Sequence, residues 1–175
     1  MITQPILDAL CLTASGRERS ALYLDHLNVS MSRHLINTPM RAAMFLAQVA
    51  HESGEFRYVQ ELASGSAYEG RKDLGNTEPG DGVRFKGRGL IQITGRANYE
   101  ACGRAIGADF IADPALMEQP TWAVGSAAWF WQQHGMNELA DAENFDAITR
   151  RINGGSNGQQ DRLAYLMRAK KAMGI

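Results

Sequence analysis

A helix that ends on an acidic residue is the feature that most constrains this chain. Thr38 and Pro39 are typical of a helix start, because threonine caps the first amides and proline fits the first turn. The residues after them are spaced to turn one face inward: Met44, Phe45, Ala47, Gln48 and Val49. Glu52 then precedes Gly54, a helix stop. The sequence therefore predicts a buried helix that delivers a carboxylate at its end.

Glu52 is a candidate acid catalyst. At a helix C-terminus the unpaired carbonyls carry partial negative charge, and apolar side chains beneath would remove water, so both effects favour the protonated carboxyl group. Glu61 follows nine residues later, close enough for a short chain reversal to bring it opposite Glu52. Two carboxylates in unlike surroundings can serve as acid and base, as glycoside hydrolysis requires. The alternative is that both glutamates belong to a solvated face.

Composition narrows the class of protein. A chain of 175 residues is most simply one domain, and a net charge of −1 supplies no broad attraction for nucleic acid or an anionic membrane. Cys11 and Cys102 are too few for a disulfide scaffold and are expected to be buried or free thiols. Asp8 interrupts the apolar run near the N-terminus, so we expect neither a signal peptide nor a membrane span.

Six further segments have helical patterns. They are Ile6 to about Leu12, Arg17 to about Leu35, Asn98 to Ile106, Thr121 to about Gly135, Asn144 to Ile152 and Gln159 to Met173. The last should turn Leu163, Leu166, Met167 and Ala169 toward the core. Trp129 and Trp131 diverge by about 200° on a helix, so both cannot face one core. Core packing is favoured for each, and stacking on a sugar is the alternative.

Residues 63–89 have a different texture, crowded with Gly, Asp, Asn and Pro and without helical periodicity. The apolar residues Tyr68, Leu74, Val83 and Phe85 argue against a flexible linker. A short strand-like stretch, F-K-G-R-G-L-I-Q-I-T, runs from Phe85 to Thr94. We therefore expect a mainly α-helical protein in which a small loop or β element forms one wall of a cleft.

Several common catalytic motifs are missing. His51 and Glu52 begin an H-E-x-x-H zinc motif, but position 55 is Glu, so the second imidazole is absent. The glycines at 87 and 89 are followed by Gln92 where a dinucleotide loop needs glycine, and no phosphate-binding loop or G-x-S-x-G elbow occurs. We expect no metal and no cofactor, which leaves carboxylate chemistry.

Five motifs occur in a diagnostic order. They are A-H-E-S-G at 50–54, Glu61, F-K-G-R-G-L-I-Q-I-T-G-R-A-N-Y at 85–99, I-N-G-G at 152–155 and D-R-L-A-Y at 161–165. Together they resemble glycoside hydrolase family 19, which contains plant-type chitinases and a branch of bacteriophage endolysins. The resemblance implies a lysozyme-like, two-lobed fold with a sugar cleft. It also implies one catalytic domain over residues 1–175, with helices in about 1–37 and the family core in 38–175.

The resemblance further implies that the chain hydrolyses a β-1,4-linked N-acetylhexosamine polymer with inversion at the anomeric carbon. Glu52 matches the general acid, Glu61 lies where the endolysin branch has its general base, and Thr94 matches a residue that holds the attacking water. Six more matches are expected to contact substrate: His51, Gln92, Asn98, Tyr99, Asn153 and Arg162. Arg162 matches an arginine near the acid, where its charge could tune the carboxylates.

Two departures from the plant-type members bear on the substrate. Those members place a much longer insertion between acid and base, and after N-G-G they have Glu where this chain has Asn157. We therefore expect a monomeric endolysin, made in the bacterial cytoplasm and acting on the cell wall after release. Its partner would be peptidoglycan, cut between N-acetylmuramic acid and N-acetylglucosamine, with no nucleic acid and no stable membrane insertion. The alternatives are a chitinase, a non-catalytic glycan-binding module and a wall peptidase.

Overall fold

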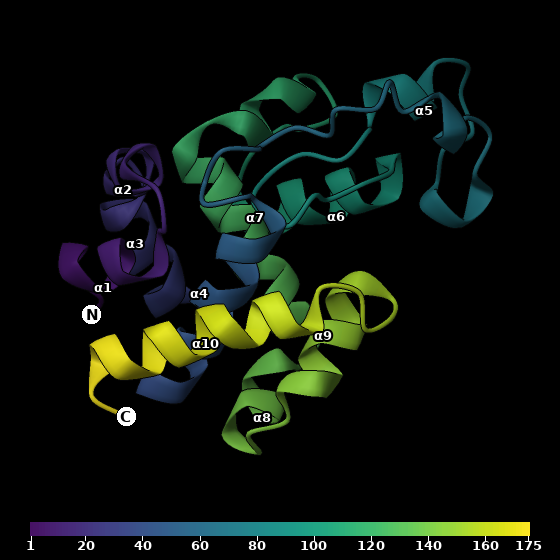
Figure 1. Ribbon diagram of the computed structural model, residues 1–175. Coiled ribbons are helices and arrows are strands. Elements are labelled where there is room, and N and C mark those ends of the chain that lie inside the picture. Colours follow the sequence, from purple (N-terminus) through teal and green to yellow (C-terminus); the bar gives the residue numbers. More distant parts are fainter.

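The computed structural model describes residues 1–175 and is mainly helical (Figure 1). The α-helices are α1 (Gln4–Leu10), α2 (Ala14–Ala21), α3 (Leu24–Arg33), α4 (Pro39–Glu52), α5 (Asp81–Arg84), α6 (Arg96–Ile106), α7 (Pro120–Gln133), α8 (Met136–Asp141), α9 (Phe145–Asn153) and α10 (Gln159–Met173). Three 3₁₀ helices are η1 (Ser66–Tyr68), η2 (Lys72–Leu74) and η3 (Pro114–Glu118). No helix is both long and apolar enough to cross a bilayer.

The central helix α4 confirms the pattern from which it was predicted. The Thr38 hydroxyl accepts a hydrogen bond from the Arg41 amide at 3.2 Å, Pro39 occupies the first turn, and the helix ends at Glu52. Every residue from Ala42 to Ala50 is buried. This complete burial requires cover on all sides, and α10, which runs across α4 in Figure 1, supplies much of it.

The apolar residues form two clusters, and each is the core of one of the two lobes of the molecule. The larger joins α1, α3, α4, α8, α9 and α10, and the smaller joins the loop at 85–93 with α6 and η3. Helix α7 belongs to both, because Trp131 is fully buried in the larger cluster and Trp129 is 8% exposed in the smaller. Core packing, the favoured prediction for each tryptophan, is therefore confirmed over stacking on a sugar, because α7 lies between two cores and both of its faces are covered.

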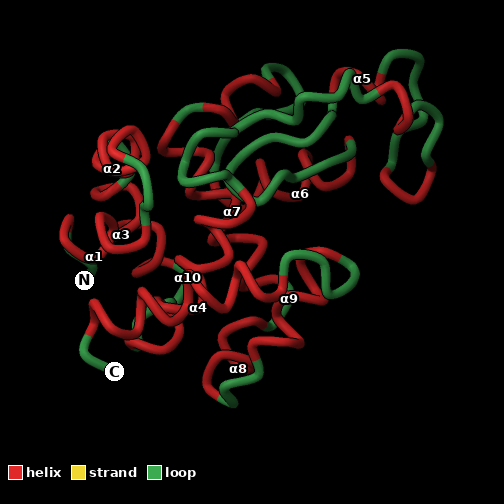
Figure 2. Tube along the Cα trace, in the orientation of Figure 1, coloured by secondary structure: helices red, strands yellow, loops and turns green.

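The chain between residues 60 and 95 contains no strand (Figure 2). Two isolated antiparallel bridges, Gln60 with Arg88 and Arg88 with Ile93, hold it together. The predicted loop or β element is thus a bridged loop region. It forms the upper lobe of Figure 1 together with α5 and α6.

Three details of the helices differ from the sequence-based expectations. The segment from Arg17 to Leu35 is two helices, α2 and α3, because the chain bends where Tyr23 turns inward and stacks on Phe56 at 5.2 Å. Helix α8 was not predicted. On α10, Leu163 and Met167 are 39% and 65% exposed, because the inward face is taken by Arg162 and Tyr165.

Both cysteines are free and buried, as predicted. Cys11 lies in the larger cluster and Cys102 in the smaller. Burial raises the pKa of Cys11 to about 11 and that of Cys102 to about 12, so neither thiol ionises at neutral pH. Because the thiolate is the nucleophilic form of cysteine, neither residue is suited to act as a nucleophile.

Candidate active site

Glu52 is held by an arginine from the far end of the chain. The Arg162 Nη2 atom lies 2.6 Å from Glu52 Oε1, and the arginine side chain is only 2% exposed. Arg162 also donates to Gln48 Oε1 at 2.5 Å, and Gln48 donates to Thr149 Oγ1 at 3.0 Å. Gln48 and Glu52 are four residues apart and so share one face of α4. Apolar side chains were predicted beneath Glu52, but the structure has a guanidinium group there, held in a polar network.

The neighbouring residues repeat this pairing. His51 Nδ1 lies 2.6 Å from Asp161 Oδ2, so two consecutive residues of α4 pair with two consecutive residues of α10. Gly158 packs against the imidazole, where a Cβ would stand 2.5 Å from His51 Cε1, and its φ of +71° also favours glycine. The end of α4 and the start of α10 are thereby fixed against each other.

A left-handed turn follows Glu52. Gly54, Glu55 and Phe56 have φ values of +55°, +59° and +63°, and the last two are residues that rarely adopt this conformation. Their side chains are both buried, with Phe56 stacked on Tyr23 and Glu55 only 7% exposed. Burial of these side chains offsets the strain of the turn.

Glu55 fastens this turn to the N-terminal helices. Its carboxylate accepts hydrogen bonds from the Leu12 amide at 2.7 Å, from the Thr13 hydroxyl at 2.9 Å and amide at 3.3 Å, and from the Tyr165 hydroxyl at 3.4 Å. Burial opposes ionisation, but these donors outweigh it and hold the pKa of Glu55 below its ordinary value. The residues before 38 thus support the segment that carries the candidate site.

We expect Glu55→Gln to lower the free energy of unfolding by about 1–3 kcal/mol at pH 7, because an amide cannot accept from all of these donors. A group whose pKa is lowered by folding stabilises the protein above its unfolded value, here 4.5, and this contribution is lost as pH falls through the folded pKa. The difference between the two proteins in their free energy of unfolding, measured with urea, should therefore shrink below about pH 4.5.

Glu18→Gln, on the exposed face of α2, is the control. Equal stability of wild type and Glu55→Gln at pH 7 would refute the anchoring role.

Glu61 lies in a different environment: two neutral groups donate to its carboxylate, and the Lys86 ammonium group donates to its main-chain carbonyl at 3.2 Å. The Tyr68 hydroxyl donates to Oε1 at 3.0 Å, and the Gly87 amide donates to Oε2 at 3.1 Å. The Glu61 amide in turn donates to the Gly87 carbonyl at 2.9 Å. Burial and the bond to Glu61 raise the pKa of Tyr68, so this hydroxyl remains a donor. Gly87 has no room for a side chain, because a Cβ would lie 2.7 Å from Gln92 Oε1 and 3.3 Å from Glu61 Oε2.

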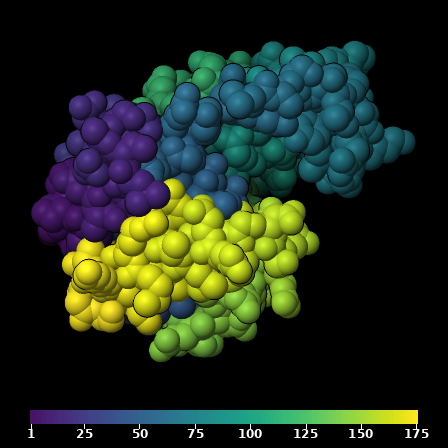
Figure 3. Space-filling model, viewed as in Figure 1, coloured from purple at the N-terminus to yellow at the C-terminus, as the bar shows by residue number.

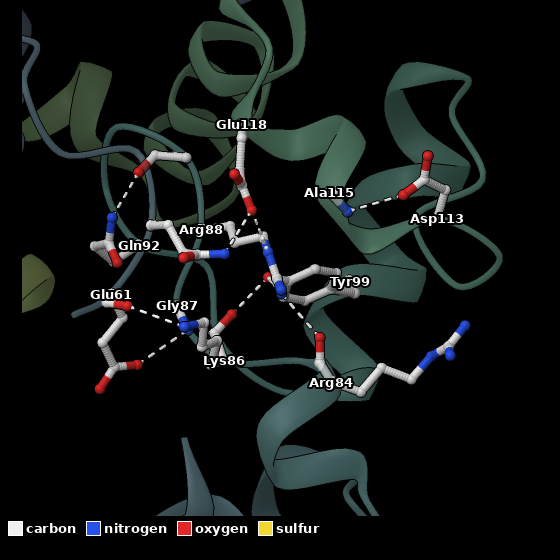
Figure 4. A network of polar contacts seen from close by, with 12 residues as sticks. Glu61, Arg84, Lys86, Gly87, Arg88, Gln92, Tyr99, Asp113, Ala115 and Glu118 are labelled. Atoms are coloured by element: carbon white, nitrogen blue, oxygen red, sulfur yellow. Dashed lines mark hydrogen bonds and ion pairs between the residues drawn. The ribbon is translucent and has the colours of Figure 1, made fainter. Parts of the chain in front are cut away.

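The loop that carries Gly87 is fixed by a buried arginine (Figure 4). Arg88 donates to Glu118 at 2.8 Å, to the Arg84 carbonyl at 2.8 Å and to the Tyr99 hydroxyl at 3.1 Å. Tyr99 donates to the Lys86 carbonyl at 2.5 Å. The same Glu118 oxygen accepts from Gln60, next to Glu61 in the chain, at 2.7 Å. This network sets the position of the Glu61 carboxylate.

The structure brings four of the other predicted residues to the Glu61 side. Gln92 Nε2 donates to the Gly89 carbonyl at 2.9 Å, and its Oε1 is buried without a partner. The Thr94 hydroxyl donates to the Gln92 carbonyl at 3.2 Å, and Asn98 Nδ2 donates to the Thr94 carbonyl at 2.7 Å. Tyr99 is a correction: it is fully buried in the smaller cluster, so it supports the loop and cannot contact substrate.

The remaining predicted residues lie on the Glu52 side. Asn153, at the end of α9, donates to the Asn157 carbonyl at 3.4 Å, and Arg162 donates to the same carbonyl at 3.3 Å. Arg162 is a second correction, since its burial against Glu52 prevents substrate contact; its position beside Glu52 is the expected one. Sequence reasoning missed Tyr68 and Glu55, because nothing local to either residue shows its partner.

The molecular surface is hollowed between the two lobes (Figure 3). One side of this groove is formed by the chain from about residue 65 to 105 and the other by α9 and the start of α10. Glu61 lies on the chain that leads into the first wall, and Glu52 is paired through Arg162 with α10, whose start belongs to the second. The two candidate carboxylates therefore have unlike surroundings, one beside a guanidinium group and the other held by a hydroxyl and a backbone amide.

Comparison with known families gives one match over most of the chain. The model for glycoside hydrolase family 19, described as chitinase class I, matches residues 38–162. This range includes both glutamates, the loop at 85–99 and Arg162.

Individual proteins agree with that match. A glycosyl hydrolase family 19 domain-containing protein of Haemophilus influenzae is 34% identical over 154 residues, covering 70% of this chain and 75% of that protein. An endochitinase of Arabidopsis thaliana is 38% identical over 140 residues, which cover 76% of this chain but 48% of the plant enzyme. Chitinase C of Streptomyces griseus has a similar structure, with a TM-score of 0.74 and 27% identity over 88% of this chain and 71% of that one.

Proposed function

This chain belongs to glycoside hydrolase family 19, and from that premise we propose that it cleaves a β-1,4-linked N-acetylhexosamine glycan by inversion, with Glu52 as acid and Glu61 as base. One observation carries the assignment: the two carboxylates have opposite surroundings. Glu52 faces a buried guanidinium, whereas Glu61 accepts from a hydroxyl and a backbone amide. Unlike environments allow a pair of carboxylates to divide the acid and base roles, and the match of Glu52 to the family's general acid decides which residue has which role.

The acid step follows from the Arg162 contact. Glu52 gives its proton to the glycosidic oxygen as the bond to the anomeric carbon breaks, and it becomes a carboxylate. Arg162, held in place by Gln48, stabilises that carboxylate with a charge-assisted contact at 2.6 Å. The arginine therefore favours transfer of the proton from Glu52 to the leaving oxygen.

The base step belongs to the other wall. Glu61 removes a proton from a water molecule that attacks the opposite face of the sugar. Tyr68 and Gly87 hold the carboxylate in one orientation, which limits the geometries in which it can accept that proton. We assign the Thr94 hydroxyl to the attacking water and the half-buried Gln92 side chain to the sugar beside it.

For the substrate we propose peptidoglycan, cut between N-acetylmuramic acid and N-acetylglucosamine, so that the protein acts as an endolysin on the cell wall. This rests on the short path between the glutamates: only the turn at 54–56 and a few residues separate Glu52 from Glu61, where plant-type members have a longer insertion. Chitin is the second candidate, because the Arabidopsis thaliana and Streptomyces griseus relatives are chitinases by name.

The substrate proposal is tested by the identity of the new reducing ends. Purified peptidoglycan and a chitin hexamer are each incubated with the protein, and the products are reduced with borohydride before sugar analysis. We expect muramitol from peptidoglycan and a lower rate on chitin. Glucosaminitol in place of muramitol would show that the other linkage is cut, and turnover of chitin alone would make the protein a chitinase. Peptidoglycan that loses no glycan bonds but gains free amino groups would identify a peptidase.

A further inference from the structure

A second hollow lies next to the turn that follows α4. It has a volume of about 570 Å³ and is lined by residues of α2, of the turn at 54–58 and of α10, among them Arg19, Arg57, Tyr58 and Tyr165. We call it the arginine groove. Gly54 also lines it, and since Gly54 is two residues from Glu52 their Cα atoms lie within about 7 Å.

The charges in the arginine groove are not neutralised by the protein. Arg19 donates from Nε to the Glu55 carbonyl at 3.3 Å, which fixes the side chain and leaves its other nitrogens free of any ion pair. Arg57 is exposed, lies over the Tyr58 ring at 5.0 Å and has no carboxylate within ion-pairing distance. Two guanidiniums thus face the groove with free donors.

One carboxylate lines the same groove, that of Glu55, and it does not satisfy these arginines. Its oxygens accept from Leu12, Thr13 and Tyr165, and neither forms an ion pair with Arg19 or Arg57. Tyr58 adds an aromatic surface that is 37% exposed. The groove therefore offers planar, bidentate donors for a carboxylate and a ring for an apolar stem beside it.

We propose that the arginine groove binds carboxylates of the stem peptide that peptidoglycan carries on its muramic acid residues. This inference rests on the proposed function, and it names the part of the substrate that distinguishes peptidoglycan from chitin. The stem peptide branches from a sugar at the cleavage site and carries ionised carboxylates, whereas chitin carries none. Guanidinium groups beside the turn after Glu52 can therefore form ion pairs with peptidoglycan but not with chitin.

Binding to the catalytically disabled Glu52→Gln protein tests the inference. One probe is the disaccharide with its peptide, released from peptidoglycan, and the other is the same molecule with its carboxylates converted to amides. By calorimetry, adding Arg19→Gln and Arg57→Gln should weaken binding of the first probe at least about tenfold, the loss expected for hydrogen bonds to charged groups. Binding of the amidated probe should change less than about twofold. Arg33→Gln, an exposed arginine of α3, is the matched control.

Equal weakening of both probes would overturn the inference, because it would show contact with the sugar or general damage. Unchanged binding of both probes would overturn it as well. The preference of the parent protein for the carboxylate probe should also fall with added salt, since an exposed ion pair is screened. Muramitol release by wild type is measured in parallel: its absence would refute cleavage between N-acetylmuramic acid and N-acetylglucosamine, whichever result the two probes give.

Discussion

Glu52→Gln should reduce the rate of glycan cleavage by at least about 10²–10⁴-fold, the contribution of a positioned general acid. The change keeps the size of the side chain and an oxygen that can face Arg162, but it removes the proton that the leaving oxygen needs. The reaction is followed by reducing-end release from whichever glycan the wild type cleaves. Binding of the same glycan should persist, because the groove is unchanged.

Two comparisons make this result specific. Glu100→Gln, an exposed glutamate of α6, should retain wild-type activity, and thermal unfolding should show that Glu52→Gln remains folded. If Glu52→Gln folds and keeps more than about a tenth of the wild-type rate, a role as general acid is untenable.

Glu61→Gln should cause the second large loss, again about 10²–10⁴-fold in kcat, because an amide cannot take the proton of the attacking water. Tyr68→Phe is the matched comparison. It removes one of the two donors to the Glu61 carboxylate and leaves the carboxylate itself, so we expect a loss of no more than about tenfold. A Tyr68→Phe effect as large as that of Glu61→Gln would show that the hydroxyl, and not the carboxylate, is the reacting group.

The fold was predictable where one local signal determined it. Thr38 and Pro39 began α4 where the capping rules place them, and α10 has the expected bounds, Gln159–Met173. The sequence also placed Gln48 on the inward side of α4, where the structure shows it bonded to Arg162. In each case the residues within one or two turns decide the outcome.

The prediction failed where a partner lies far away in the chain. The left-handed conformation of Glu55 and Phe56 depends on Leu12, Thr13 and Tyr23, more than 30 residues earlier, and no local pattern shows those contacts. Trp129 was expected to compete with Trp131 for one core, because a sequence does not reveal that α7 separates two. The face of α10 was misjudged because two of its inward residues, Arg162 and Tyr165, are polar residues that serve the site.

The candidate site was likewise predictable from local signals but not where the partners are distant in the chain. Glu52 was placed correctly at a helix end, but the guanidinium beside it comes from the opposite end of the chain. The residues that hold Glu61, namely Tyr68 and Gly87, come from separate parts of an irregular loop. Resemblance to a family supplied the proposed reacting groups, whereas the residues that hold them in position could be found only in the structure.

The configuration of the first product tests the central claim, that Glu52 and Glu61 act as acid and base on opposite faces of one sugar. Proton NMR spectra are recorded during early turnover of a soluble glycan, before the new reducing end equilibrates. Attack by a water molecule activated by Glu61 inverts the β-linkage, so we predict that the α-anomer appears first and the β-anomer grows in later by mutarotation. Initial release of the β-anomer would require a covalent or substrate-assisted intermediate, and it would contradict this account of the site.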